Sequence, residues 1–307
     1  MPVDLSNILV IGVSSRALFD LEKENEVFEK EGIAAFRSYQ LQNENEILEP
    51  GAAFYLVKSL LQLNQQANQP IVEVVIMSSN SPETGMRVMK SLTAHDLPIT
   101  RMAFTGGQPM AGYMKGYSID LFLSKDARDV QKVIDAGSSA AALIYDPPKS
   151  FNPDNSLVKI AFDADAVIFS EESEFRYKTE GIESFQHYEK ENEHIPITAG
   201  PFAKLLIKLS NIQHQLPSGI ELSPLRIAIV TARSAPAHIR VVNTLREWGV
   251  YVDEIFFLGG LPKDKILQSF GAHIFFDDQE YHLESSSKVV PSGKVPYPSS
   301  SKMNKLK

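Results

Sequence analysis

The sequence predicts an α/β protein with Rossmann-like, mostly parallel sheets covered by helices on both faces. Three observations predict this class. Short apolar runs end in small, polar or acidic residues, longer segments repeat apolar side chains near every 3.6 residues, and the two patterns alternate along the 307 residues. Strands that alternate with helices favour a parallel sheet, in which ligands bind beyond the carboxyl ends of the strands.

The expected strands are six apolar runs, each short enough for a strand and each followed by residues that interrupt it. In chain order they are Ile8–Val13, Val72–Met77, Lys159–Phe162, Leu225–Val230, Ile255–Leu258 and His273–Phe276. The clearest helix is Ala237–Trp248, in which Ile239, Val242 and Leu245 share a side, and Pro236 suits its first turn. Asp163, Thr231 and Asp277 fall at the carboxyl ends of predicted strands.

Composition limits the classes of function. Hydrophobic residues make up 43% of the chain, which is enough for a packed core. The formal net charge of −8 argues against binding of a nucleic acid polymer, and the absence of cysteine excludes disulfides and thiolate sites. The first apolar run lacks a basic region before it, and no window approaches the ~18 apolar residues of a membrane span. We therefore expect a cytoplasmic protein without a membrane partner, and leave open whether it forms a homo-oligomer.

The chain also contains an internal repeat. A shift of 153 residues, without gaps, lays residues 74–125 over 227–278, so that FTGGQP from Phe104 meets FLGGLP from Phe257. A shift of 149 residues lays Glu31-Gly-Ile33 over Glu180-Gly-Ile182. The ungapped order of these matches predicts two copies of one α/β unit.

The repeat sets the expected domain organisation. Residues 1–150 form the first α/β copy, and residues 151–283 form the second, which contains a small helical insert at 171–215. Residues 284–307 form a C-terminal extension, in which Val289–Tyr297 suits docking as an extended segment. The last ten residues have too little apolar surface to offset the entropy lost on ordering, so we expect them to be disordered.

The two copies are chemically unequal. The matched pairs are Asp163 with Ser14, Asp165 with Arg16, Thr231 with Ser78, Lys263 with Met110, Asp277 with Ser124, and Asp278 with Lys125. The first copy therefore lacks every carboxylate of this set that could hold a cation. We expect the chemistry in the second half, and a scaffold, substrate-contact or assembly role for the first.

Four features of the second half occur in an order that suits phosphoryl transfer. Asp163-Ala-Asp165 and Thr231 each end a strand, Lys263 follows a glycine pair, and Asp277-Asp278 ends a further strand. A carboxylate nucleophile splits hydrolysis into formation and breakdown of an aspartyl-phosphate. A divalent cation on oxygen ligands offsets the repulsion between that carboxylate and an anionic substrate. A hydroxyl and a cationic side chain then meet the charge on the phosphoryl oxygens.

This order resembles the haloacid dehalogenase-like (HAD-like) phosphohydrolase superfamily. Five motifs narrow the resemblance to the cytosolic 5'-nucleotidase type 1 family of AMP-preferring, magnesium-dependent enzymes, over roughly residues 8–282. They are VSSRALFD from Val13, FDADAVIFSEESE from Phe162, VTARSAP from Val230, LGGLPK from Leu258 and IFFDDQ from Ile274. The set of motifs is specific, although each motif alone is common.

The resemblance implies a HAD-like catalytic half beside a degenerate HAD-like repeat, and it implies catalytic roles. Asp163 would be the nucleophile. Asp165 would protonate the leaving nucleoside oxygen and later activate water. Thr231 would bind the phosphoryl group, and Lys263 would balance its charge.

The same resemblance implies a metal site and a substrate contact. Mg²⁺ would lie among Asp163, Asp277 and Asp278, with the backbone carbonyl of Asp165 as a further ligand. Arg233, which follows shortly after the motif threonine, is assigned to the phosphate or the ribose.

Recognition of the nucleoside is left open. The insert contains three aromatic side chains, Phe175, Phe185 and Tyr188. At helical spacing such residues belong to a core more often than they stack on a base. Ser14, Ser15 and Arg16 follow the first strand as a polar cluster with three possible roles: contact with the nucleotide, the interface between the copies, or helix capping.

The expected function is therefore Mg²⁺-dependent hydrolysis of nucleoside 5'-monophosphates of the AMP type to nucleoside and phosphate. Two alternatives are kept. A HAD-type sugar phosphatase would share the chemistry but would not need the paired first half. A nucleotide-binding regulatory protein without turnover would need no nucleophile and acid one residue apart, as Asp163 and Asp165 are.

Overall fold

Ten strands form one continuous sheet in the computed structural model, which describes residues 4–148, 151 and 156–306. Their order is β3-β2-β1-β4-β5-β10-β9-β6-β7-β8. Every neighbouring pair is parallel except β5 with β10. The protein is thus of the α/β class with a mostly parallel sheet, as the sequence predicts. The predicted boundary between the copies, at residues 150 and 151, involves residue 150, which lies outside the described residues.

The first half supplies the five strands on one side of the sheet. They are β1 (Leu9–Val13), β2 (Val72–Ser78), β3 (Arg101–Phe104), β4 (Leu121–Ser124) and β5 (Ala140–Ile144). Its helices are α1 (Ser15–Leu18), α2 (Glu22–Glu31), α3 (Ile33–Gln42), α4 (Phe54–Gln62), α5 (Met86–Ala94) and α6 (Ala127–Ala136), with short turns η1 (Leu63–Gln65) and η2 (Ala111–Tyr113). All five residues of β1 are buried, because parallel strands are covered on both faces.

The second half supplies the other five strands. They are β6 (Val158–Phe162), β7 (Leu225–Thr231), β8 (Glu254–Phe257), β9 (Ile274–Asp277) and β10 (Ser292–Lys294). Its helices and turns are η3 (Ala164–Ile168), α7 (Glu172–Glu180), α8 (Ile182–Glu191), α9 (Ala203–Gln215), α10 (His238–Glu247), α11 (Asp264–Phe270), α12 (Glu280–Ser286) and η4 (Lys302–Lys305). In the register of the sheet, Phe162 lies between Ile229 and Phe276, so the carboxyl ends of β6, β7 and β9 are neighbours.

A shared hydrophobic core joins the two halves. Helix α4 of the first half packs on β6, and helix α9 of the second half packs on β1. Side chains from both halves line one small apolar cavity; among them are Leu9, Leu56, Ile160, Leu205 and Ile274. The sheet and its core therefore run through both halves.

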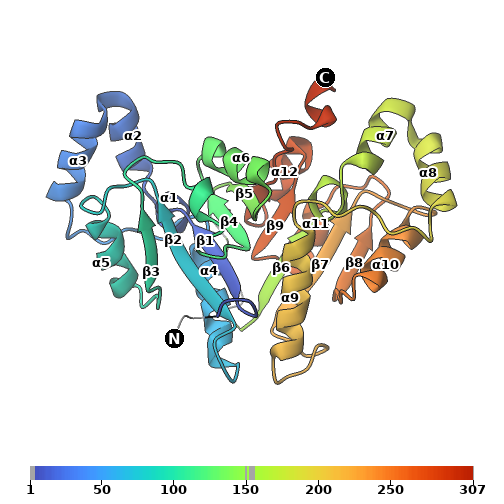
Figure 1. Cartoon of the computed structure of the whole chain (residues 1–307), viewed down its shortest axis with the longest axis horizontal. Helices are drawn as coiled ribbons and strands as arrows, with labels where there is room; N and C mark the ends of the chain where they lie inside the picture. Colours follow the sequence, from blue (N-terminus) through green and yellow to red (C-terminus); the bar gives the residue numbers. More distant parts are fainter. Residues whose placement is uncertain (1–3, 149–150, 152–155, 307) are drawn as a thin grey trace.

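Two helical hairpins stand clear of this core. The α2–α3 and α7–α8 hairpins lie near opposite ends of the long axis of the molecule, and both lie at the top in the view of Figure 1. The insert expected at residues 171–215 therefore divides into two parts. Helices α7 and α8 form a hairpin that we call the lid, whereas α9 belongs to the layer that covers the sheet, with Leu205, Leu206 and Leu209 buried.

The C-terminal extension connects the two half-sheets. Strand β10 pairs in parallel with β9 and antiparallel with β5, and Gly293 lies opposite both Phe276 and Ile144. The extended segment expected at Val289–Tyr297 thus includes the strand at the centre of the sheet. Among the described residues, no helix combines the length and the apolar composition needed to cross a membrane.

The expected disorder of the last ten residues is wrong for residues 298–306. Ser299 donates from its backbone N–H and its hydroxyl to Asp135 of α6, at 2.7 Å each. Ser301 caps η4 by accepting from the N–H of Met303 at 2.9 Å, and Met303 is only 4% exposed. One buried methionine and hydrogen bonds to distant residues such as Asp135, rather than a long apolar run, hold this segment.

Candidate active site

Asp163 follows the last residue of β6 and is tied to the neighbouring strand. Its backbone N–H donates to the carbonyl of Phe276 in β9 at 2.8 Å, which brings the two strand ends together. The chain then makes the single wide turn η3, closed by a bond from the N–H of Phe169 to the carbonyl of Ala164 at 2.9 Å. Ala166 adopts φ 60° in this turn, a left-handed conformation that costs an alanine roughly 1–2 kcal/mol. Such strain is common at functional sites.

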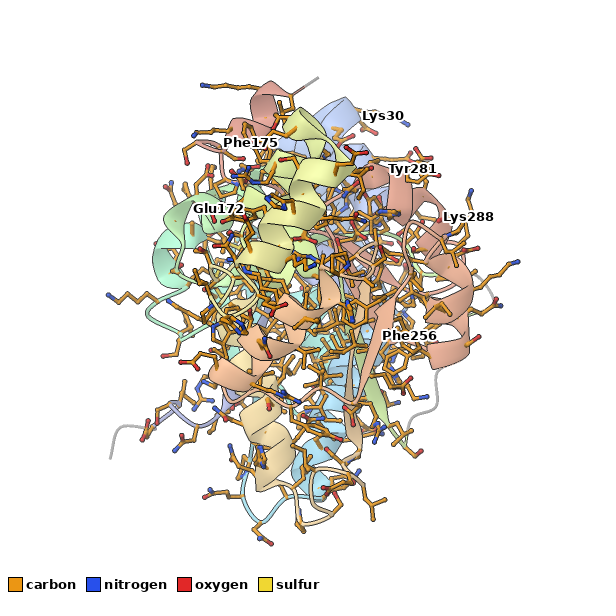
Figure 2. The ribbon with its side chains drawn as sticks, turned by 90° about the vertical axis from the view of Figure 1, so that its right-hand side faces the viewer. Lys30, Glu172, Phe175, Phe256, Tyr281 and Lys288 are labelled. Carbon is orange, nitrogen blue, oxygen red and sulfur yellow. The ribbon has the colours of Figure 1, made fainter. Side chains whose placement is uncertain are left out.

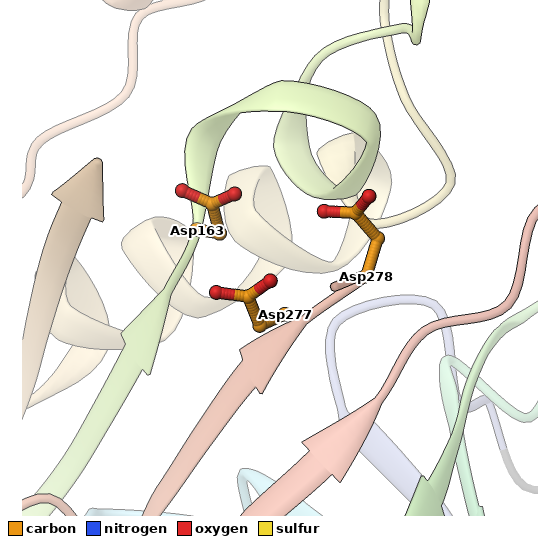
Figure 3. Close-up of side chains that lie close together, drawn as sticks. All are labelled: Asp163, Asp277 and Asp278. Atoms are coloured by element: carbon orange, nitrogen blue, oxygen red, sulfur yellow. The ribbon is translucent and has the colours of Figure 1, made fainter. Parts of the chain in front are cut away.

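Three aspartates from two strand ends converge beside this turn. Asp163, Asp277 and Asp278 each offer one carboxylate oxygen, and these oxygens lie within 4.8 Å of one another (Figure 3). The three residues are only 4%, 0% and 4% exposed. The carboxylate of Asp277 is oriented by a hydrogen bond, because its Oδ1 accepts the backbone N–H of Gln279 at 2.8 Å.

Lys263 is the cation that balances this cluster in part. Its Nζ lies 2.8 Å from Asp163 Oδ1 and 2.7 Å from Asp277 Oδ2, and the side chain is 1% exposed. Burial opposes the charge of Lys263, but the two aspartates outweigh it and raise its pKa. Three carboxylates against one ammonium group leave two negative charges uncompensated when all four are ionised.

The cluster fits a divalent cation. Carboxylate oxygens are the ligands that Mg²⁺ prefers, and two positive charges would balance the excess. Asp278 Oδ1 is buried without a hydrogen-bond partner among the described residues, which is costly for a carboxylate unless a cation approaches it. Asp163, Asp277 and Asp278 are therefore the residues that would hold the ion.

Burial, together with the neighbouring negative charges, raises the pKa values of two of the aspartates. Burial raises the pKa of Asp163 to about 8, Lys263 opposes this, and Asp277 adds to it. Burial also raises the pKa of Asp278 well above its usual range, with further contributions from Glu174 and Asp277. Both carboxyl groups therefore retain a proton more readily than an exposed aspartate does.

Thr231 ends β7 at the same edge of the sheet and is fully buried. Its Oγ1 accepts the backbone N–H of Arg233 at 3.2 Å, which fixes the hydroxyl at the start of the following loop. The carbonyl of Thr231 accepts the N–H of Leu258 at 2.9 Å, and the loop that begins there leads to Lys263. Of the two residues predicted to meet a phosphoryl group, Thr231 is thus bonded to the start of the loop that carries Lys263.

Asp165 lies apart from the three clustered aspartates and pairs with Arg233. Both carboxylate oxygens accept from the guanidinium group: Oδ2 from Nε at 2.8 Å and Oδ1 from Nη2 at 2.7 Å. The Asp165 side chain is thus not one of the grouped ligand atoms. The ligand role that the sequence assigns to its backbone carbonyl stays a prediction.

Arg233 also ties Asp165 to the lid. Its Nη1 donates to Glu189 of α8 at 2.6 Å, and Arg240 and Ser173 donate to the other oxygen of Glu189 at 3.2 and 2.7 Å. Burial opposes the charge of Arg233, but Asp165 and Glu189 outweigh it and raise its pKa. Both ends of the guanidinium are occupied by carboxylates, so contact with a phosphate or ribose, as predicted, requires an exchange of partners.

The aromatic residues of the lid pack against these charges. The guanidinium of Arg233 lies 5.3 Å from the centre of the Phe185 ring, and that of Arg240 lies 5.3 Å from the centre of the Tyr188 ring. Phe185 is 7% exposed. This arrangement agrees with a packing role for these rings, which the sequence left open beside stacking on a base.

The structure does not bring Ser14, Ser15 and Arg16 to the aspartate cluster. They follow β1, which four strands separate from β6; at about 4.8 Å per strand this is roughly 24 Å across the sheet. Ser14 caps α1 by accepting the N–H of Ala17 at 3.2 Å, Ser15 bonds to the hydroxyl of Ser78 at 3.0 Å, and Arg16 pairs with Glu22 at 2.7 Å. Of the three roles considered, helix capping is observed for Ser14.

One protein family matches this chain over nearly its whole length. A sequence model of 5'-nucleotidases matches residues 1–302. The chain belongs to the 5'-nucleotidase family. It is also 37% identical over 297 residues to human cytosolic 5'-nucleotidase 1B, a match that covers 94% of this chain and 48% of the relative. The chain thus spans about half the length of that relative.

Likeness to solved structures is weak. A chain of the Pnkp1/Rnl/Hen1 complex superposes with a TM-score of 0.32 at 11% identity, covering 95% of this chain and 97% of that one. Histidinol dehydrogenase from Elizabethkingia anophelis gives a TM-score of 0.23 at 10% identity, covering 81% and 51%. Neither value supports an argument about fold or function. The match to the 5'-nucleotidase family, by contrast, extends over both halves of the sheet.

Three residues near the site have no counterpart among the residues predicted from sequence. They are Glu174, Glu189 and Tyr297. Glu174 and Glu189 stand in acidic, helical segments where most acids face solvent, so no pattern separates them from their neighbours. Tyr297 contacts Asp278, 19 residues before it, and Glu174, 123 residues before it, so no local pattern marks these contacts. The expectation that Val289–Tyr297 docks as an extended segment is the signal that the sequence gives for it.

Replacing Glu189 tests how the lid is held. The Glu189→Ala variant leaves two buried arginines, Arg233 and Arg240, with one carboxylate between them, so we expect a loss of about 3–5 kcal/mol in the free energy of unfolding. The matched control is Glu26→Ala on α2, whose exposed pair with Lys30 is expected to contribute less than about 1 kcal/mol. Denaturant unfolding measures both. Equal losses in the two variants would contradict the account.

The raised pKa values predict how cation binding depends on pH. Below about pH 8, Asp163 carries a proton that must leave when a cation binds. The affinity for Mg²⁺ should therefore rise between about pH 6 and pH 8, by up to about tenfold per pH unit for each proton displaced. Isothermal titration in buffers of different ionisation enthalpy gives both the affinity and the protons released. An affinity that is the same at both ends of this range, without proton release, would refute the assignment.

Proposed function

We propose that the chain is a Mg²⁺-dependent 5'-nucleotidase that hydrolyses nucleoside 5'-monophosphates of the AMP type in the cytoplasm. The observation that carries this proposal is the buried group of Asp163, Asp277 and Asp278 around Lys263, which suits a cation and a phosphate together. Membership of the 5'-nucleotidase family supports the substrate class. The relative named cytosolic 5'-nucleotidase 1B supports the compartment.

In the proposed first step, a carboxylate oxygen of Asp163 attacks the phosphorus atom of the substrate. The bond from phosphorus to the nucleoside 5'-oxygen breaks, and that oxygen takes a proton from Asp165. The nucleoside leaves, and the phosphoryl group remains on Asp163 as an acyl phosphate. The Thr231 hydroxyl and the Lys263 ammonium group meet the charge on the phosphoryl oxygens.

In the second step, Asp165 takes a proton from a water molecule, whose oxygen attacks the phosphorus. The acyl-phosphate bond breaks, phosphate is released and the Asp163 carboxylate is restored. When bound, Mg²⁺ offsets the repulsion between that carboxylate and the phosphate dianion. Both steps require Asp165 to exchange its two bonds with Arg233, so the structure corresponds to a resting arrangement.

We further propose that the two halves are copies of one HAD-like unit, of which only the second is catalytic. The strand order read from each edge supports this, because β3-β2-β1-β4-β5 mirrors β8-β7-β6-β9-β10. The hairpin joints agree as well: Gly32 between α2 and α3 has φ 83°, and Gly181 between α7 and α8 has φ 86°. These left-handed conformations at matched positions favour glycine in both copies.

Phosphate release from a substrate panel tests the function. We expect Mg²⁺-dependent release from AMP and other nucleoside 5'-monophosphates, abolished by EDTA and reduced at least about 10³-fold in Asp163→Asn. Asp96→Asn is the matched control and should retain activity. Asp96 is exposed and has φ 53°, a backbone conformation that asparagine also tolerates.

The same panel distinguishes the alternatives. Release from sugar phosphates alone would keep the mechanism and refute the nucleotide substrate. Tight nucleotide binding without any release would favour a regulatory protein over an enzyme.

A further inference from the structure

The C-terminal extension contacts two residues of the aspartate cluster after leaving β10. The backbone N–H of Val295 donates to the carbonyl of Asp277 at 2.9 Å, which ties the extension to a residue of the aspartate cluster. Two residues later, the carbonyl of Tyr297 accepts from Gln131 of α6 at 3.0 Å. The extension is thus fixed on one side to the second half and on the other side to the first.

The hydroxyl of Tyr297 lies between two buried carboxylates. It donates to Asp278 Oδ2 through a short hydrogen bond, and it lies 3.3 Å from Glu174 Oε2 on the lid helix α7. Asp278 and Glu174 are only 4% and 5% exposed. A hydroxyl has one proton, so it bonds fully to only one of the two carboxylates at a time.

This bond determines which oxygen of Asp278 remains for a cation. Tyr297 occupies Oδ2, whereas Oδ1 is buried and has no hydrogen-bond partner among the described residues. Partners that orient a metal-ligating carboxylate from behind contribute substantially to metal affinity. The hydroxyl of Tyr297 stands in that position.

The extension also reaches the lid at two further points. Ser301 Oγ donates to Glu171 Oε2 at 2.5 Å, just before α7 begins. Lys302 Nζ lies 6.0 Å from the centre of the Phe175 ring, which Figure 2 shows next to the C-terminal turn. Glu174 in turn accepts from Gln279, the neighbour of Asp278, at 2.9 Å. Lid, extension and aspartate cluster therefore form one connected set of contacts.

We infer that Tyr297 is a positioning residue for the cation: it orients Asp278 toward the metal and couples that orientation to the position of the lid. The inference deepens the proposed function, because it concerns the cation of that same site. Nothing in it requires Tyr297 to touch the substrate. The C-terminal extension would then contribute to cation binding at the site.

A pair of matched tyrosine variants tests the inference on the full chain. Tyr297→Phe removes only the hydroxyl. Tyr145→Phe, the control, removes a hydroxyl that bonds Glu280, a carboxylate outside the cluster, at 2.8 Å. Mg²⁺ affinity, measured by isothermal titration without substrate, should fall by about 10–100-fold in Tyr297→Phe and stay within about twofold of wild type in Tyr145→Phe.

Hydrogen exchange in the same variants tests the coupling to the lid. Amides of α7 should exchange faster in Tyr297→Phe than in wild type, and those of α5, which lies in the other half, should not change. A merely local packing defect would alter exchange without altering Mg²⁺ affinity, and that result would overturn the inference. Equal affinity of Tyr297→Phe and wild type, or no Mg²⁺ binding by wild type at all, would do the same.

The titration is independent of turnover. Wild-type protein that binds Mg²⁺ in a Tyr297-dependent manner but hydrolyses no nucleotide would refute the proposed function and leave this inference standing. Conversely, a nucleotidase whose Mg²⁺ affinity does not depend on Tyr297 would refute the inference alone.

Discussion

The balance of buried charge at the ends of β6 and β9 is the constraint on which the site depends. Asp163, Asp277 and Asp278 share one ammonium group, that of Lys263, in a region that is almost completely removed from water. Buried carboxylates are tolerated only when they are paired, protonated or bound to a metal. Lys263, which follows β8, and Tyr297 of the extension both contact members of that group of aspartates.

A second group of buried, paired charges holds the lid, and the corresponding charges are arranged differently in the first half. In the second half Glu189 on α8 holds Arg240 and Arg233. In the first half Arg87, at the position of Arg240, pairs with Glu24 on α2 at 2.5 Å, while the position of Glu189 holds the buried Gln40. The carboxylate has thus moved from one helix of the hairpin to the other. Each hairpin is paired with a helix of its own half, α5 or α10, but only the second is also connected, through Arg233, to an acid of the candidate site.

The sequence predicts the positions of the clustered aspartates better than it predicts their surroundings. The sequence predicts Asp163, Thr231 and Asp277 at strand ends, because each follows an apolar run, and it predicts Lys263 after a glycine pair, where the structure has it just before α11. Strands β3, β4 and β5 are absent from the expected runs; Ala140–Ile144, for example, contains three alanines, which are depleted in strands. Contacts made through Glu189 and Tyr297 join segments far apart in the chain, and no local pattern encodes them. The order of the C-terminal residues was missed for the same reason.

The position of a bound cation tests the central claim most directly. A crystal structure of the protein with Mn²⁺ in place of Mg²⁺, analysed by anomalous scattering, would locate the ion without any assumption about substrate. The account predicts one strong peak among the carboxylates of Asp163, Asp277 and Asp278, with Tyr297 still bonded to Asp278. An empty cluster at saturating Mn²⁺, or an ion held by other residues, would contradict it.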